Sequence, residues 1–300
     1  MRILVTGASG FVGRPALRKL LESPAAHHIQ AWGRGGSAPT PHARLQWVSC
    51  DLRNPASYEG ALRLFRPEIV LHLAWEGIPD FSTGRSLANL ETGVRFADFL
   101  LDLECCKKVI VAGSCFEYDQ LVGACSESTL GQPKDAFTWA KHSLRSYLAL
   151  KCAARKVVLA WGRIFYVYGP NQRSGSLVPT LLDHLRRGLL PALKTPQNAN
   201  DFVYVDDVAE WYVRAIEQEI TSGIFNVGSG RSTTVLEMCR IAERTVLESD
   251  SLTQALREAT AETPATVDFW ADLGRTNQHL SWQPRIDENE GIRLTWESLG

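Results

Sequence analysis

The chain has 300 residues, of which 45% are hydrophobic and 22% are charged, a composition that supports a buried core without disulfide bonds and excludes a disordered or fibrous protein. Its 32 Lys and Arg residues balance 33 Asp and Glu residues, and the resulting net charge of -1 argues against nucleic acid or an anionic membrane as a partner. Because the sequence shows no apolar run of the roughly 18 residues that cross a bilayer, no signal-peptide pattern and no zinc-ligand spacing among its cysteines, we expect a reduced cytoplasmic protein without a metal.

Short β-rich apolar runs alternate with longer helical patterns in the first 165 residues. Most of these runs are continuously apolar, as expected for strands that helices cover on both faces. The predicted strands span residues 3–6, 29–32, 45–48, 69–73, 109–112 and 157–160, and the predicted helices span residues 12–21, 56–65, 87–103 and 138–151. This alternation predicts an α/β fold with a doubly wound parallel sheet.

The pattern changes after Gly169-Pro170, where prolines interrupt the chain. Beyond them we predict a strand at 202–205 and helices at 206–217 and 234–247. We therefore divide the chain into a first domain, residues 1–165, and a smaller, irregular α/β domain, residues 166–300, with segments near 202–228 returning to the sheet.

A glycine-rich turn directly follows the first predicted strand and opens the first helix, with the sequence Thr6-Gly7-Ala8-Ser9-Gly10-Phe11-Val12-Gly13. Glycines let such a turn adopt positive φ and let backbone N–H groups approach a pyrophosphate, whose charge a helix N-terminus stabilises. We interpret residues 1–165 as a dinucleotide-binding Rossmann domain. The expected cofactor contacts are Gly7, Ser9, Gly10, Phe11, Val12 and Gly13.

The end of the second predicted strand indicates which dinucleotide binds. A carboxylate there would accept hydrogen bonds from the adenosine ribose and favour NAD, whereas this strand runs into Gly33-Arg34. Arg34 can pair with a 2′-phosphate, so NADP is preferred and NAD is the alternative. Asp51 and Leu52, after the third strand, are expected near the adenine, although Asp51 can equally cap the next turn.

Further segments follow in the order found in the extended short-chain dehydrogenase/reductase family. The chain resembles the sugar-nucleotide branch of that family, with its epimerases, dehydratases and ketoreductases, over nearly its whole length. Besides the glycine-rich turn, the matching segments are Asp51-Leu52, His72-Leu73-Ala74, Ser114, 162–170, 201–208, 226–230 and 280–284. The resemblance implies that Leu73 and Ala74 contact the dinucleotide, that a nucleotide sugar is the substrate, and that the helices at 87–103 and 138–151 form a homodimer.

The family's chemistry uses a tyrosine, a lysine four residues later on the same helix face, and a nearby Ser or Thr. The lysine binds the nicotinamide ribose and lowers the pKa of the tyrosine, which exchanges a proton with the sugar oxygen. Ser114 and Lys141 match two of these catalytic positions, but the tyrosine position is Phe137. Phenylalanine keeps the ring and removes the proton donor, and loss of a general acid costs roughly 10²- to 10⁴-fold in rate.

Three explanations of Phe137 stay open. The residue is an engineered replacement of tyrosine that traps a ligand, or a natural variant in which Ser114, Tyr118 or water held by Lys141 moves the proton, or a sign that the protein only binds its ligands. The intact motifs around it favour the first explanation.

The residues after Ser114 indicate the reaction. Dehydratases of the family carry an Asp-Glu pair there, whereas this chain has Cys115 and Phe116, with Glu117 one position late. Dehydration is therefore disfavoured, and a 3,5-epimerisation would need Cys115 as its second acid/base. Hydride transfer alone remains, and the missing carboxylate near Arg34 favours a reductase.

The resemblance of residues 72–79 and 113–118 to O-antigen and deoxysugar enzymes implies an NDP-4-keto-6-deoxysugar as substrate. Trp75, Phe81, Phe116 and Phe137 suit the apolar face of a deoxysugar. The predicted substrate contacts are Trp75, Cys115, Phe116, Tyr166, Ser176, Leu177, Asn200 and Arg275. Asn200 stands where the family often has arginine, which removes a cation for the diphosphate.

The leading hypothesis is an NADPH-dependent sugar-nucleotide 4-ketoreductase. The first alternative is a 4-epimerase that retains NAD. The second, from a different class, is a non-catalytic subunit that senses a nucleotide sugar or a dinucleotide.

Overall fold

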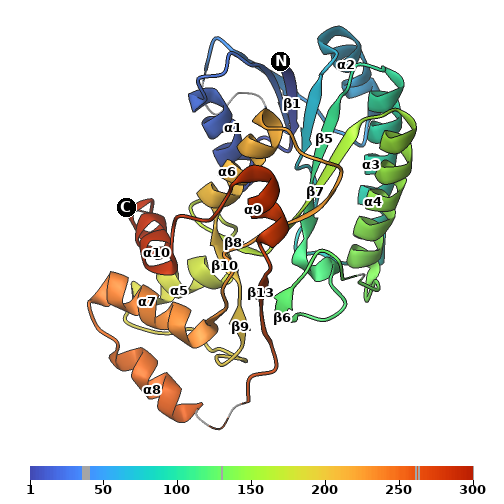
Figure 1. The fold of residues 1–300 in the computed structure, drawn as a ribbon. Coiled ribbons are helices and arrows are strands. Elements are labelled where there is room, and N and C mark those ends of the chain that lie inside the picture. Colours follow the sequence, from blue (N-terminus) through green and yellow to red (C-terminus); the bar gives the residue numbers. More distant parts are fainter. Residues whose placement is uncertain (36–40, 130, 261, 263, 300) are drawn as a thin grey trace.

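The computed structural model describes residues 1–35, 41–129, 131–260, 262 and 264–299. Its centre is a parallel sheet with the strand order β11-β7-β5-β4-β1-β2-β3 (Figure 1). These strands are β1 (Arg2–Thr6), β2 (His28–Gly33), β3 (Leu45–Ser49), β4 (Ile69–His72), β5 (Lys108–Ser114), β7 (Val158–Ile164) and β11 (Gly223–Val227). The predicted doubly wound parallel sheet is confirmed.

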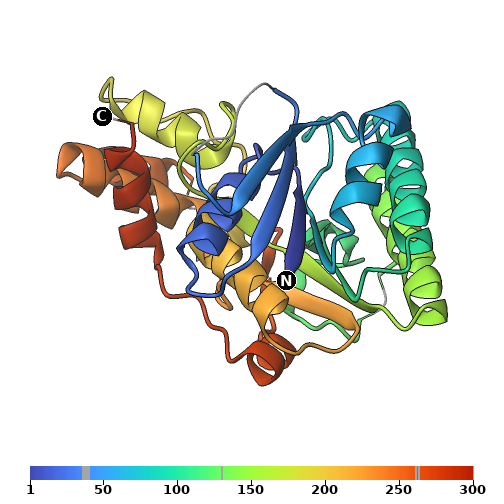
Figure 2. The ribbon, with the colours of Figure 1, turned by 90° about the horizontal axis from the view of Figure 1, so that it is seen from above.

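Helices cover both faces of this sheet, and Figure 2 shows one group on each side. One face carries α1 (Gly13–Glu22) and α6 (Val205–Glu217), and the other carries α2 (Glu59–Phe65), α3 (Thr83–Asp102) and α4 (Ala136–Ala154). Neighbouring residues of β1 belong to different cores, Val5 to the first and Leu4 to the second. Successive side chains of a strand point to opposite faces, which is why strands buried on both faces are continuously apolar.

Capping residues explain where the helix boundaries differ from the prediction. α3 starts four residues early because the Ser82 side chain accepts a hydrogen bond from Arg85 N. α4 starts two residues early because the Asp135 carboxylate accepts from Thr138 N at 2.7 Å. The helix predicted at 56–65 is divided into a 3₁₀ turn, η1 (Pro55–Ser57), and α2. N-cap side chains of this kind satisfy backbone donors that a helix leaves unpaired.

The remaining elements build a smaller lobe beside the sheet (Figure 1). Its strands are β6 (Val122–Cys125), β8 (Tyr166–Tyr168), β9 (Ala199–Asn200), β10 (Phe202–Tyr204), β12 (Thr233–Thr234) and β13 (Asp268–Ala271). A separate core joins α5 (Leu177–Leu185), α7 (Val235–Leu247), α8 (Ser251–Ala259) and α10 (Glu288–Glu297), while α9 (Gly274–Leu280) lies near β11. β6, from the first half of the chain, pairs in parallel with β13. Within the described residues no helix is long and apolar enough to cross a bilayer.

The buried carboxylate of Asp201 ties the smaller lobe together. It lies between β9 and β10 and accepts hydrogen bonds from the backbone N–H groups of Ser229 at 2.5 Å, Gly230 at 2.9 Å and Ala271 at 2.9 Å. One side chain therefore joins the turn after β11 to the end of β13.

We predict that Asp201→Ala lowers the free energy of unfolding by about 3 kcal/mol, because three backbone donors lose a charged acceptor. Asp183→Ala, on the exposed surface of α5, is the control and should change it by less than about 0.5 kcal/mol. Urea unfolding followed by tryptophan fluorescence measures both. Equal effects of the two changes would contradict the role given to Asp201.

Candidate functional site

The glycine-rich turn between β1 and α1 lies at the carboxyl edge of the sheet. Gly7 has a φ of +69°, and a Cβ atom there would lie 2.8 Å from the backbone N of Ala74. A Cβ atom on Gly13 would lie 2.1 Å from the Gly7 carbonyl oxygen. Glycine is therefore required for the turn to approach the exit of β4. Among the described residues no side chain caps the start of α1, so its backbone donors suit an anion such as a pyrophosphate.

A cavity of about 200 Å³ runs from this turn across the ends of β1, β2, β3 and β4. Most of the predicted cofactor residues line it, namely Gly7, Ser9, Gly10, Arg34, Asp51, Leu52, Leu73 and Ala74. Val12 and Gly13 form the start of α1, and Phe11 lines a second cavity beside α1. The cavity wall also includes Arg53, Glu76 and Asn89, which the sequence analysis missed because isolated polar residues resemble a solvated surface.

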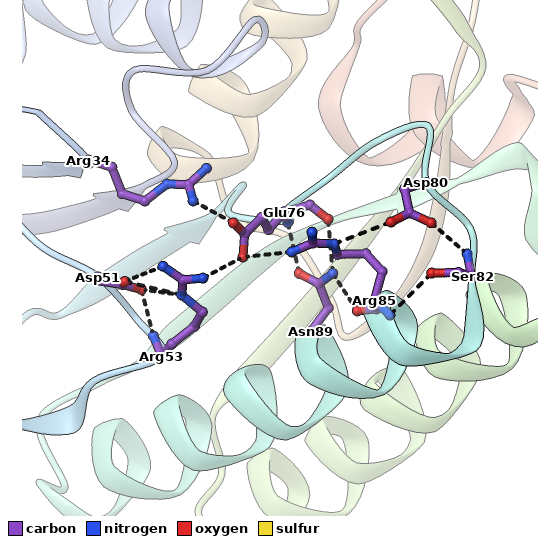
Figure 3. Close-up of polar contacts among 8 residues, drawn as sticks. All are labelled: Arg34, Asp51, Arg53, Glu76, Asp80, Ser82, Arg85 and Asn89. Carbon is purple, nitrogen blue, oxygen red and sulfur yellow. Dashed lines mark hydrogen bonds and ion pairs between the residues drawn. The ribbon is translucent and has the colours of Figure 1, made fainter.

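Glu76, in the loop after β4, lies among three arginines (Figure 3). Its carboxylate is 2.6 Å from Arg34 Nη1, 3.3 Å from Arg85 Nη1 and 3.6 Å from Arg53 Nη1. Arg53 also binds the carboxylate of Asp51 at 2.6 Å, and this hydrogen bond lowers the pKa of Asp51. Arg34 thus borders the cavity as predicted, but its guanidinium is paired with Glu76 and the Asp51 carboxylate is paired with Arg53.

Ser114, Phe137 and Lys141 come together where β5 ends against α4. Ser114 is the last residue of β5, and Phe137 and Lys141 lie one turn apart on α4. Lys141 Nζ donates to the carbonyl of Ala112 at 2.8 Å, and it lies 3.9 Å from the centre of the Trp75 ring. Burial lowers the pKa of Lys141 to about 8, because the apolar surroundings disfavour its charge. The indole of Trp75 therefore covers the ammonium group of Lys141.

Trp75 is one end of a continuous row of aromatic rings, which we call the aromatic wall: Trp75, Phe137, Phe81, Phe116 and Tyr166. The ring centres of successive members are 5.6, 4.6, 6.1 and 5.8 Å apart. These separations are those of favourable aromatic pairs. The wall joins the loop after β4, α4, the 3₁₀ turn η2 (Cys115–Glu117) after β5, and β8 into one row of rings close to Ser114.

The acidic side chain that follows Ser114 points into the protein. Glu117, in the 3₁₀ turn η2 (Cys115–Glu117), is fully buried and accepts hydrogen bonds from Ser114 N at 2.8 Å and Trp161 Nε1 at 2.9 Å. Its carboxylate also lies 3.5 Å from Arg163 Nε. A carboxylate held in this way stabilises the end of β5 and does not reach a sugar.

Two other candidates near Ser114 also face the interior. Cys115 is 2% exposed and packs in a core with Phe165 and Phe269, and burial raises the pKa of its thiol. The Tyr118 hydroxyl donates to Asn226 Oδ1 at 2.7 Å and is buried. The structure therefore does not bring Cys115 to the substrate side, and it leaves Tyr118 no path to a ligand proton.

The remaining predicted substrate residues are divided between the two lobes. Ser176 and Leu177 start α5, and Asn200 is buried on β9, opposite Thr233 of β12. Arg275 lies instead at the start of β11, where its guanidinium donates to the Ser222 carbonyl at 3.4 Å and stacks on Phe225. Because β11 is parallel to its neighbours, this is the edge of the sheet opposite the glycine-rich turn. The structure does not bring Arg275 to the cavity.

His72, the last residue of β4, also lines the cavity. Its Nδ1 lies 2.8 Å from Thr6 Oγ1, and its ring stacks on Phe96 with centres 5.2 Å apart. Burial lowers the pKa of His72 to about 3, with a smaller contribution from the charge of Lys141. The imidazole is therefore neutral at physiological pH and joins β4 to β1.

Comparisons with known proteins agree with this fold. The sequence profile of the NAD dependent epimerase/dehydratase family matches residues 3–228. The dTDP-L-rhamnose 4-epimerase of Burkholderia thailandensis is 24% identical over 97% of this chain and 93% of its own length. The dTDP-6-deoxy-L-talose 4-dehydrogenase (NAD(+)) of Aggregatibacter actinomycetemcomitans is 27% identical over 77% of this chain and 85% of its own. The crystal structure of Thermotoga maritima UDP-glucose 4-epimerase with UDP-glucose matches 100% of this chain and 98% of its own, with 25% identity and a TM-score of 0.79.

The buried His72 predicts that acid destabilises the protein. The unfolded chain binds this proton near pH 6.5 and the folded chain only near pH 3, so between these values the unfolded state holds more protons. The free energy of unfolding should therefore fall with falling pH, by about 2 kcal/mol from this residue between pH 7 and pH 5. Urea unfolding of the wild type and of His72→Asn at several pH values measures this difference. Parallel pH profiles would show that His72 makes no such contribution.

Proposed function

The chain belongs to the NAD dependent epimerase/dehydratase family, and we propose that it reduces an NDP-4-keto-6-deoxysugar with NADPH, at a rate limited by the missing phenol at position 137. The family is one of sugar-nucleotide enzymes of the extended short-chain dehydrogenase/reductase type.

The observation that carries the proposal is the placement of the acidic groups beside Ser114. Elimination or epimerisation at a second carbon needs a further acid/base that touches the sugar. Here Glu117 is engaged by Ser114 N and Trp161, and Cys115 is buried in a core. Hydride transfer at one carbon is the chemistry that needs neither group. The relative named as a 4-dehydrogenase supports this choice.

The cavity wall favours NADP over NAD. Arg34 and Arg53 stand at the ends of β2 and β3, and the carboxylate of Asp51 is engaged by Arg53. The glycine-rich turn would hold the pyrophosphate, and Arg34 would hold a 2′-phosphate. When bound, the nicotinamide supplies the hydride. NAD stays the alternative, because the name of the 4-dehydrogenase specifies NAD(+) and the 4-epimerase possibility would require retained NAD.

The aromatic wall supports a deoxysugar as the substrate. Its rings give an apolar surface beside Ser114, which suits a sugar carbon that has lost its hydroxyl group. Two relatives have names that specify sugars of this kind, dTDP-L-rhamnose and dTDP-6-deoxy-L-talose.

The start of α5 and Asn200 would contact the nucleotide. Exposed Leu87, Trp139 and Leu150, on α3 and α4, support the expected homodimer.

A non-catalytic sensing subunit is the second candidate, and a specific observation favours it. Trp75 covers the ammonium group of Lys141, and Phe137 lacks the hydroxyl that would donate the proton. Two of the three catalytic positions are therefore affected. In the sensor the nucleotide-binding half would function alone. In the reductase, Trp75 would leave Lys141 when the dinucleotide binds, and Ser114 or water held by Lys141 would supply the proton.

Restoring the phenol separates these candidates. We expect Phe137→Tyr to oxidise NADPH roughly 10²- to 10⁴-fold faster than the wild type with a panel of NDP-4-keto-6-deoxysugars, because the general acid returns. Phe81→Tyr, which places a hydroxyl on the neighbouring ring of the aromatic wall, is the control and should not accelerate the reaction. Binding of NADPH by both variants without any turnover would favour the sensor. Retention of NAD through purification and dialysis would favour the epimerase.

The contact between Trp75 and Lys141 makes a separate prediction. Trp75→Ala removes a cation–π partner of Lys141, so the ammonium becomes available to the nicotinamide ribose, and NADPH should bind about tenfold more tightly. The affinity for 2′,5′-ADP, which lacks the nicotinamide half, should not change. Isothermal titration calorimetry measures both constants. An equal gain for the two ligands would show that Trp75 closes the adenosine end instead.

A further inference from the structure

We propose that Glu76 is a specificity-determining residue, whose carboxylate competes with the 2′-phosphate of NADP for Arg34. This inference rests on the proposed function, in which the cavity at the ends of β1 to β4 takes a dinucleotide. Position 76 is far from the strand end that usually selects the cofactor, and it reaches this site only through the fold.

Three guanidinium groups and three carboxylates form one ion-pair network around Glu76. Three guanidinium groups, those of Arg34, Arg85 and Arg53, lie within 3.6 Å of its carboxylate (Figure 3). Asp51 offsets Arg53, and Asp80, at 3.6 Å, partly offsets Arg85. Arg34 has Glu76 as its acidic partner among the described residues. A competing anion would therefore displace Glu76 from Arg34 rather than from Arg53 or Arg85.

A 2′-phosphate competes with the Glu76 carboxylate for the guanidinium of Arg34. A guanidinium binds a phosphate with two parallel hydrogen bonds, and a phosphate carries more charge than a carboxylate. The side chain of Arg34 at the end of β2 is 60% exposed and that of Glu76 is 26% exposed. Exposed ion pairs of this kind are weak, so a phosphate can displace the carboxylate.

The Glu76 side chain can leave Arg34 without disturbing the loop. Asn89 of α3 holds its main chain, accepting from Glu76 N at 2.8 Å and donating to the Glu76 carbonyl at 3.0 Å. The same amide donates to the Arg85 carbonyl at 2.9 Å. With the backbone fixed by α3, rotation of one side chain is enough to release Arg34. The carboxylate and the phosphate are therefore alternative partners of the same guanidinium.

Glu76 then limits how strongly the chain distinguishes the two cofactors. A 2′-phosphate must break the ion pair to reach Arg34 and also approaches a negative charge, whereas a 2′-hydroxyl does neither. Removing the charge of Glu76 should increase the preference for the phosphorylated ribose and leave the affinity for the unphosphorylated one unchanged.

The test compares 2′,5′-ADP with 5′-ADP by isothermal titration calorimetry, because neither probe depends on Phe137 or Trp75. We expect Glu76→Gln to bind 2′,5′-ADP about fivefold more tightly and 5′-ADP with unchanged affinity, since weak ion pairs are worth roughly a few fold each. Asp80→Asn is the matched control: it removes a carboxylate from the same loop that contacts Arg85 and should change neither affinity. In an Arg34→Ala background, Glu76→Gln should give a clearly smaller gain for 2′,5′-ADP, because only the repulsion between the carboxylate and the phosphate is then relieved.

The outcomes separate this inference from the proposed function. Equal gains for both probes in Glu76→Gln, or a loss of 5′-ADP affinity, would overturn the competition and leave the cofactor site intact. A gain of the same size without Arg34 would overturn the role of that arginine. Failure of both probes to bind any variant would reject the dinucleotide site, and with it the proposed function and this inference.

Discussion

The buried carboxylate of Glu117 is the interaction on which the candidate site depends. A charge in an apolar interior is tolerated only when partners surround it, and here they come from Ser114 N, Trp161 and Arg163. Its main-chain carbonyl also lies 3.0 Å from His142 Nε2 on α4. These contacts fix the end of β5 against β7 and α4, and they bring Ser114 next to the helix that carries Lys141. They also hold the Glu117 carboxylate away from the side of Ser114 that a substrate would approach.

In the proposed function, two adjacent residues after β4 contact the two cations that a dinucleotide would meet, by different physical means. Trp75 covers Lys141 with an aromatic ring, and Glu76 neutralises Arg34 by ion pairing. The first is a cation–π contact to a buried ammonium group, whereas the second is a partly solvated ion pair that responds to salt. A ligand that binds through its nicotinamide half must displace the ring, and one that binds through its phosphate must displace the carboxylate. Cofactor binding and cofactor choice therefore share one short loop.

The sequence predicted what depends on local patterns. Continuous apolar runs identified six of the seven strands of the central sheet, all but β11, and the turn at Gly7 to Gly13 identified the dinucleotide motif. The predicted fold class and family were confirmed. Contacts between distant segments left no such signal. The two-residue strands β9 and β12 are too short for periodicity, Glu76 reaches Arg34 only through the fold, and Arg275 is directed to β11 by the packing of α9. The cofactor choice and the residue roles stay predictions.

The pairing of β6 with β13 has a mechanical consequence. β6 follows the turn that carries Ser114 and Glu117, and it belongs to the sheet of the smaller lobe. The short segment between Tyr118 and Val122 therefore connects a residue bonded to the central sheet with a strand of the smaller lobe. A shift of the smaller lobe relative to the central sheet would therefore be transmitted through these residues toward Ser114 at the end of β5. The pairing of β6 with β13 thus couples the position of the smaller lobe to the position of the Ser114 hydroxyl.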